Sequence, residues 1–161
     1  MSISIKLREY LESRDVRFEH HVHPTAYTAQ ETAEAMHVPG KDFAKTVVIK
    51  ADGALLLAVI PADRKVNLHH LQFVTRSEYI EIATESDFKE AFPTCEVGAM
   101  PPFGLLWGLT TYCDTRLELN DYIEFNAGTH NDTIRMSFWD FKKHANPTML
   151  DLVVHPQNRV A

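Results

Sequence analysis

The sequence predicts an α+β fold, in which a mixed and mainly antiparallel sheet, or a barrel-like core, is surrounded by helices. Three observations lead to this prediction. Helical and extended patterns alternate along the chain, two apolar runs flank an Asp52-Gly53 turn, and capping residues precede several helical stretches. The chain has 161 residues, of which 45% are hydrophobic, and this is enough to build one core. We therefore expect one domain over residues 1–161.

The N-terminal elements are expected to be a helix, a strand and a second helix. Apolar residues from Ile3 to Leu11 recur at helical spacing and predict a helix over residues 2–14. A short strand is expected over residues 18–21. Thr28 begins a T-x-x-E capping box, which predicts a helix that stops before the next Pro-Gly pair.

The central elements are expected to form a hairpin. Residues 44–50 and 54–60 are rich in Val, Ile and Leu, and the Asp52-Gly53 pair lies between them. Both strands are apolar enough to lie at the centre of the sheet. Pro61 ends the second strand, and a short helix is expected over residues 67–71.

The C-terminal half is expected to add two capped helices and further strands. Thr84 and Asp87 cap a helix that Pro93 ends. Ser137 caps the last helix, which ends before Asn146-Pro147. The strands predicted between these two helices are residues 105–113, 122–126 and 133–136.

Composition and charge exclude several classes of protein. The formal net charge is -6, which argues against a protein that grips long stretches of nucleic acid, although contact with one end of a nucleic acid stays open. No stretch approaches the roughly 20 apolar residues of a membrane span, and the N-terminus has no apolar targeting core. We therefore expect a cytoplasmic protein that does not enter a membrane.

The cysteines and most of the histidines are expected to be structural or surface residues. Cys95 and Cys113 lie far apart without metal-ligand spacing, and we expect structural thiols. The histidines crowd together at residues 20–23 and at residues 69–70 without the spacing of a zinc site. The sequence thus indicates no metal and no cofactor. Two alternatives stay open, namely that Cys95 is a nucleophile and that His23 lines the mouth of a pocket.

A loop bracketed by two glycines is the first candidate for a functional element. Its sequence is Gly98-Ala99-Met100-Pro101-Pro102-Phe103-Gly104, and we call residues 98–104 the Gly98 loop. Proline makes its middle rigid, whereas glycine lets its ends reach angles that other residues avoid. Such a loop can aim backbone N–H groups at an oxyanion, a carbonyl or an attacking water. The alternative is a plain turn.

Two polar residues occupy unusual places in this pattern. Lys45 lies near the start of an otherwise apolar strand, where it must snorkel to solvent, find a partner or face a pocket. His130 lies between two predicted strands, close to Gly128, and is either a surface residue or points into a cleft. No catalytic triad order, nucleophile elbow or nucleotide-binding glycine motif is present in the sequence.

Three segments together resemble the YbaK family, the free-standing relatives of the editing domain inserted in bacterial prolyl-tRNA synthetases. The matching patterns are the strand lysine followed by Thr46, the G-x-x-x-P pattern of the Gly98 loop, and the G-x-H-x-x-x-I pattern of residues 128–134. Length and element order agree over nearly the whole chain. The resemblance implies the fold of that family for residues 1–161.

The resemblance also implies hydrolysis of the ester that links a wrong amino acid to the 3′-terminal adenosine of a tRNA. Lys45 would hold the terminal phosphate or adenosine, and the Gly98 loop would direct N–H groups to the scissile carbonyl and its water. His130 and Gly128 would border the amino-acid pocket. The implied catalytic residues are Lys45, Gly98, Ala99, Met100, Pro101, Pro102 and His130. The implied substrate-binding residues are His23, Thr28, Thr46, Phe103, Gly128, Thr129 and Ile134.

The resemblance implies a substrate that is a tRNA, such as tRNA-Pro, carrying a small wrong amino acid and held at its acceptor end. It also implies prolyl-tRNA synthetase as a partner. Thr46 differs from the asparagine of alanine-specific members, whereas His130 resembles their histidine, so alanine, cysteine and serine all stay open. Two other functions also stay open. One is a non-catalytic module that binds tRNA, a nucleotide or a synthetase, and the other is an unrelated hydrolase that uses Cys95 or a histidine cluster.

Overall fold

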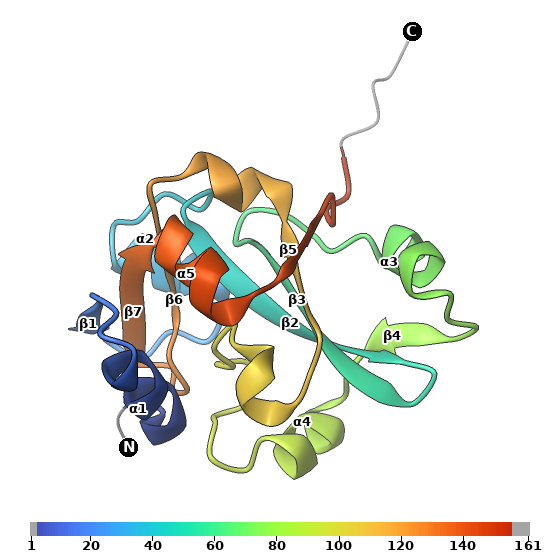
Figure 1. Ribbon diagram of the computed structural model, residues 1–161, viewed down its shortest axis with the longest axis horizontal. Helices are drawn as coiled ribbons and strands as arrows, with labels where there is room; N and C mark the ends of the chain where they lie inside the picture. Colours follow the sequence, from blue (N-terminus) through green and yellow to red (C-terminus); the bar gives the residue numbers. More distant parts are fainter. Residues whose placement is uncertain (1–2, 156–161) are drawn as a thin grey trace, which may run out of the picture.

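A long hairpin forms the centre of an eight-stranded sheet in the computed structural model, which describes residues 3–155 (Figure 1). Its strands are β2 (Phe43–Ala51) and β3 (Ala54–Pro61), and Gly53 in the turn has a φ of +83°. Ile49, Leu57 and Ile60 are fully buried on this hairpin. The hairpin expected around Asp52-Gly53 is therefore present.

The other strands extend the sheet on both sides of the hairpin. They are β1 (Glu19–Val22), β4 (Ile80–Ile82), β5 (Thr111–Asp114), β6 (Tyr122–Asn126), β7 (Asp132–Ser137) and β8 (Thr148–Leu150). The strand order is β1-β7-β6-β2-β3-β5-β8, and β4 pairs with β2 outside this path. The β1/β7, β6/β7, β2/β3 and β2/β4 pairs are antiparallel, whereas β2/β6, β3/β5 and β5/β8 are parallel. The predicted mixed and mainly antiparallel sheet is confirmed.

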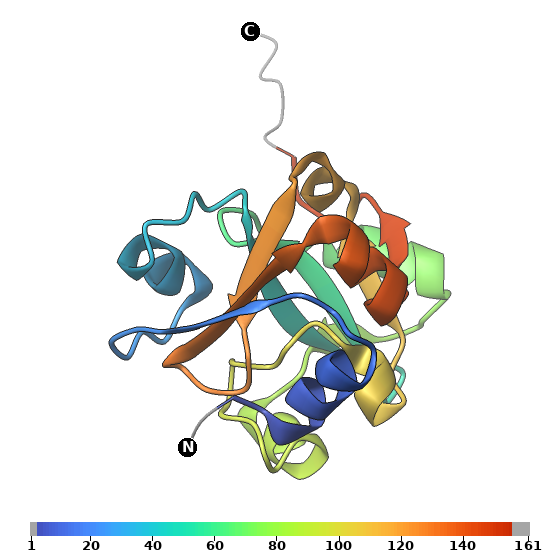
Figure 2. The same cartoon turned by 60° about the vertical axis from the view of Figure 1, so that its left-hand side comes forward.

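The helices surround this sheet, and three of them begin at the expected caps. They are α1 (Ile5–Ser13), α2 (Ala29–Ala35), α3 (Leu68–Thr75), α4 (Glu85–Ala91) and α5 (Phe138–Ala145). The hydroxyls of Thr28, Thr84 and Ser137 each accept the backbone N–H of the third residue of their helix, because these side chains satisfy donors that have no partner inside the helix. In Figure 2, α2 lies on the left and α5 on the right, and β6 and β7 run between them.

The structure differs from the sequence prediction at several short elements. Residues 105–113, expected as one strand, divide into a 3-10 helix over Gly104–Trp107 and strand β5, because Gly108 turns the chain with a φ of +70°. Helix α1 starts at Ile5 behind its cap Ser4, and α3 continues to Thr75. Strands β4 and β8 and a second 3-10 helix, Thr115–Leu119, were not expected.

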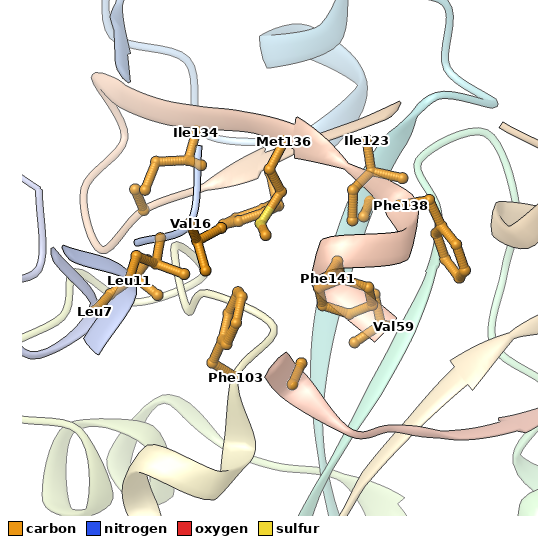
Figure 3. Close-up of a cluster of buried hydrophobic side chains, with 14 of the residues drawn as sticks. Leu7, Leu11, Val16, Val59, Phe103, Ile123, Ile134, Met136, Phe138 and Phe141 are labelled. Atoms are coloured by element: carbon orange, nitrogen blue, oxygen red, sulfur yellow. The ribbon is translucent and has the colours of Figure 1, made fainter. Parts of the chain in front are cut away.

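The largest buried cluster lies between the sheet, α1 and α5 (Figure 3). Leu7 and Leu11 of α1 meet Phe141 of α5 and Phe103 of the Gly98 loop in this cluster, and all four are fully buried. The Phe103 ring lies 5.5 Å from that of Phe141 and 5.8 Å from that of Phe125, measured between ring centroids. The far end of the Gly98 loop is therefore anchored in the core.

The register between β2 and β6 determines where the sheet opens. These parallel strands pair at only two positions, Phe43 with Glu124 and Ala44 with Phe125. The next residues along the two strands, Lys45 and Asn126, lie beyond this pairing. Their side chains are therefore placed at the edge of a gap between neighbouring strands.

We expect Phe103→Ala to lower the free energy of unfolding by about 3–5 kcal/mol, because it leaves a cavity among packed aromatic rings. Urea unfolding followed by circular dichroism measures this change. Leu119→Ala is the matched control, since its side chain is 84% exposed and its loss should change stability by less than about 0.5 kcal/mol. Equal effects of the two variants would contradict the core role of Phe103.

Candidate functional site

A cavity of about 410 Å³ opens at the gap between β2 and β6. Its walls come from β2, from the first residues of α2 and α4, from Asn126 and from the Gly98 loop. Its inner surface is mainly apolar, with Val48, Phe88 and Met100 buried around it. Ligand pockets commonly have volumes of about 300–1,000 Å³ and place few polar groups on an apolar wall, so this cavity has the properties of a small-molecule site.

Another groove, of about 830 Å³, lies beside Trp107 and Ile5. Among the described residues that line it, Lys6 alone carries a charged side chain, and the Lys6 ammonium lies over the Trp107 ring at 5.3 Å. This groove contains none of the residues that the sequence singled out. The smaller cavity is therefore the candidate site.

Lys45 lies on the wall of the candidate site and is half buried. Its ammonium group donates a hydrogen bond to the carbonyl oxygen of Arg64 at 2.9 Å. Burial lowers the pKa of Lys45 below its ordinary value, Asp63 opposes this shift, and Lys65 adds to it. Of the three alternatives for a lysine on this strand, the structure therefore shows a partner and a pocket.

The Gly98 loop forms another part of the wall through Gly98 and Met100. Gly98 has a φ of +85°, and a Cβ atom added there would lie 3.6 Å from Cε1 of His130. The N–H of Ala99 donates to the carbonyl of Glu96 at 3.0 Å, which closes a turn. The N–H groups of Gly98 and Met100 have no hydrogen-bond partner among residues 3–155. Two residues that line the cavity thus carry main-chain donors without a partner in the described part of the chain.

The segment around Gly128 and His130 holds this loop from behind. Gly128 donates its N–H to the carbonyl of Ala99 at 2.9 Å and accepts the N–H of Glu96 at 2.8 Å. The His130 ring donates from Nε2 to the carbonyl of Val97 at 2.6 Å. Gly128 has a φ of +107°, and a Cβ atom there would meet Ser4 at 3.1 Å. Glycine and histidine at these positions therefore fix the backbone just before and after Gly98.

The structure brings together five of the residues expected at the site. These are Lys45, Gly98, Met100, Thr28 and Thr46, all of which line the cavity. The other expected residues lie outside its wall, namely His23, Ala99, Pro101, Pro102, Phe103, Gly128, Thr129, His130 and Ile134. Phe103 and Ile134 are fully buried in the main core, so their visible role is packing (Figure 3).

Two more of these outlying residues have internal partners. His23 is 5% exposed, and its Nδ1 donates to the carbonyl of Pro24 at 2.7 Å. Thr129 donates its hydroxyl to Asp132, in the turn that joins β6 to β7. Both residues therefore shape the backbone near the site and not the cavity surface.

Asn126 is the most informative residue that sequence reasoning missed. It is 8% exposed at the end of β6, lines the cavity, and carries a buried Oδ1 atom with no hydrogen-bond partner among the described residues. A polar residue directly before Ala127-Gly128, at the end of an apolar strand, was a usable signal. Tyr27, Thr84 and Phe88 also line the cavity and were not expected there.

The remaining reactive side chains do not form a second site. Burial raises the pKa of Cys95 to about 11, so its thiol stays protonated and is a poor nucleophile. His20 donates to Asp132 at 2.6 Å and His21 donates to Glu124 at 2.8 Å, so each of these two buried carboxylates has a histidine partner. Over residues 3–155 no group of three or more metal-binding side chains is placed to hold an ion.

Comparison with known proteins identifies the family. The family model of the aminoacyl-tRNA editing domain matches residues 23–144, a span that contains Lys45, the Gly98 loop and His130. This chain belongs to the aminoacyl-tRNA editing domain family. The resemblance to YbaK proteins drawn from three short patterns is thereby confirmed, and membership supports aminoacyl-tRNA deacylation as its function.

Curated relatives include proline–tRNA ligases. That of Leuconostoc citreum is 29% identical over 109 residues, which cover 68% of this chain and 19% of the ligase. That of Caldicellulosiruptor saccharolyticus is 25% identical over 120 residues, covering 74% of this chain and 20% of the ligase. The chain thus matches about a fifth of the length of each ligase.

Solved structures share the fold. One, provisionally described as a trans-editing enzyme for prolyl-tRNA synthetase, has a TM-score of 0.81 at 19% identity and covers 96% of this chain and 100% of its own. A hypothetical protein has a TM-score of 0.84 at 18% identity, covering 92% and 99%. At these identities the likeness concerns the fold alone.

In the described part of the chain, no helix has the length and apolar character needed to span a membrane.

We expect the pKa of Lys45 to lie below the ordinary lysine value of 10.5, because burial disfavours its charged form. Asp63→Asn should lower this pKa further, since the Asp63 carboxylate stabilises the ammonium. An NMR titration of ¹³C-methylated lysines measures both values, with the exposed Lys89 as the reference. An unchanged or raised midpoint for Lys45 in Asp63→Asn would contradict the assigned causes.

Proposed function

We propose that this protein is a trans-acting deacylase that hydrolyses the ester of a mischarged tRNA, such as tRNA-Pro carrying a small wrong amino acid. The attacking water is positioned by backbone groups, and no side chain acts as a nucleophile. The observation that carries this proposal is the pair of unpartnered N–H groups at Gly98 and Met100 beside the cavity that Lys45 also lines.

The two N–H groups suit the oxyanion that develops when water attacks an ester carbonyl. Each donor of this kind contributes roughly 100-fold to 1,000-fold in rate when it is held in place before reaction. The hydrogen bonds from Glu96 and Gly128 and the bond from His130 to Val97 hold the loop in this way. An aminoacyl ester is already reactive, so aligned water and a stabilised oxyanion suffice without a strong general base.

Lys45 is proposed to bind the terminal phosphate or adenosine of the tRNA. An ammonium group is a compact charge with three donors, and the Arg64 carbonyl uses only one of them. The strand and the bond to Arg64 restrict where the charge can lie, which sets the depth that the ester reaches. A net charge of -6 fits contact with the acceptor end better than contact along the tRNA body.

The apolar wall of the cavity selects amino acids by size. Val48, Phe88 and Met100 border the cavity, and in the proposed complex they would lie beside the amino-acid side chain and favour a small one over a large one. One methylene contributes only about 10-fold to 200-fold selectivity, and this is why editing acts as a second sieve after the synthetase. The similarity to proline–tRNA ligases supports mischarged tRNA and prolyl-tRNA synthetase as the proposed partners, and the cytoplasm is the proposed location of this reaction.

We expect wild-type protein to deacylate at least one member of a panel of alanyl-, seryl- and cysteinyl-tRNA-Pro. Gly98→Ala should lower kcat by about 100-fold, because alanine disfavours the φ of +85° that directs the loop N–H groups. Deacylation of ³²P-labelled tRNA under single-turnover conditions measures the rate.

Gly53→Ala is the matched control for this variant. Gly53 has a φ of +83° and lies in the hairpin turn with open space around it, so both substitutions should cost about 1–2 kcal/mol of stability. Only Gly98→Ala should lose activity. Absence of turnover with every charged tRNA would overturn the enzyme proposal in favour of a binding module, and equal rates for both variants would overturn the role of the loop.

A further inference from the structure

The candidate site contains two buried polar atoms that nothing in the described structure satisfies. They are Oδ1 of Asn126 and the hydroxyl oxygen of Thr46, and both residues line the cavity. Buried polar atoms in proteins nearly always have a hydrogen-bond partner, so an exception beside a cavity calls for a partner that a ligand or an ordered water supplies. Two such atoms in residues that line one cavity point to a polar group of a ligand between β2 and β6.

Asn126 is held at this position by its strand. It pairs with Thr133 across β6 and β7, directly after the last residue of β6 that pairs with β2. The residue is 8% exposed, so its amide has little contact with solvent. A ligand group that reaches Oδ1 therefore replaces very little water and gains most of a hydrogen bond.

The chemistry of Oδ1 restricts what that group can be. An amide oxygen only accepts hydrogen bonds, so its partner must be an N–H or O–H donor. The carbonyl and ester oxygens of an aminoacyl ester are acceptors and cannot pair with it. The α-ammonium group has three donors and is directly attached to the carbon next to the scissile carbonyl. No hydrogen bond joins the Lys45 ammonium, which donates to the Arg64 carbonyl, to Oδ1 of Asn126, so Oδ1 is free to accept from the substrate.

We infer that Asn126, assisted by the Thr46 hydroxyl, binds the α-ammonium group of the aminoacyl substrate. This inference rests on the proposed deacylase function and names the residue that reads the amino end of the ester. With Gly98 and Met100 on the carbonyl oxygen and Asn126 on the ammonium, the ester is held at both ends of its Cα–C bond. The site then distinguishes an amino acid from a hydroxy acid of the same size.

The test compares alanyl-tRNA-Pro with lactyl-tRNA-Pro, which differs only by a hydroxyl in place of the α-ammonium group. The measured quantity is the ratio of kcat/KM for the two esters. In Asn126→Leu this ratio should fall roughly 5-fold to 10-fold below the wild-type ratio, because the charged ammonium makes a stronger hydrogen bond to Oδ1 than the neutral lactyl hydroxyl does, and this difference is lost. The intrinsic reactivity of the two esters cancels in this comparison, and so does any partial loss of folded protein.

Two further variants separate acceptor chemistry from structure. Asn126→Asp keeps an acceptor at the same position and should keep or increase the preference for the ammonium ester. Asn120→Leu is the matched control, since Asn120 donates to the Lys41 carbonyl outside the cavity and its loss should leave the ratio unchanged. A drop in the ratio for Asn126→Asp equal to that for Asn126→Leu would overturn the inference, as would an unchanged ratio in Asn126→Leu.

Failure of this inference is distinguishable from failure of the proposed function. Turnover of both esters by the wild type, with the same ratio in wild type and Asn126→Leu, would overturn the ammonium role alone. Absence of turnover with every charged tRNA would overturn the deacylase function and this inference together.

Discussion

The short parallel pairing between β2 and β6 is the constraint on which the site depends. Two neighbouring strands that pair at only two positions leave a gap in the sheet from Lys45 and Asn126 onward. Side chains that would otherwise cover a continuous sheet border a cavity there, and the starts of α2 and α4 and the Gly98 loop close its sides. The cavity is thus a consequence of strand register and does not depend on any one side chain.

Rigidity behind the Gly98 loop fits the proposal that backbone N–H groups, and no side-chain nucleophile, act on the ester. A site that acts through backbone N–H groups must hold the backbone still, because those groups lose their effect when they must reorganise during the reaction. Phe103 anchors one end of the loop in the aromatic core, and Gly128 and His130 bind the other end. Gly128 and His130, which lie outside the cavity wall, therefore fix the main chain beside the cavity.

Much of the fold could be predicted from local patterns. The β2–β3 hairpin followed from two apolar runs around Asp52-Gly53, and the starts of α2, α4 and α5 followed from Thr28, Thr84 and Ser137. Residues 105–113 were misjudged because a short apolar run does not distinguish a strand from a 3-10 turn. Strands β4 and β8 have three residues each, and their pairing with distant strands leaves no local signal.

The sequence by itself determined the element types, the family patterns and the special backbone positions, because capping, glycine angles and hydrophobic periodicity act over a few residues. Only the tertiary structure decided which of those positions share a cavity. It placed Lys45, Thr46 and Gly98 around one space, moved Phe103 and Ile134 into the core, and revealed Asn126 as a cavity residue. These relations depend on strand register and on packing between segments some 30 to 80 residues apart, as in the β2/β6 pair, which no local pattern encodes.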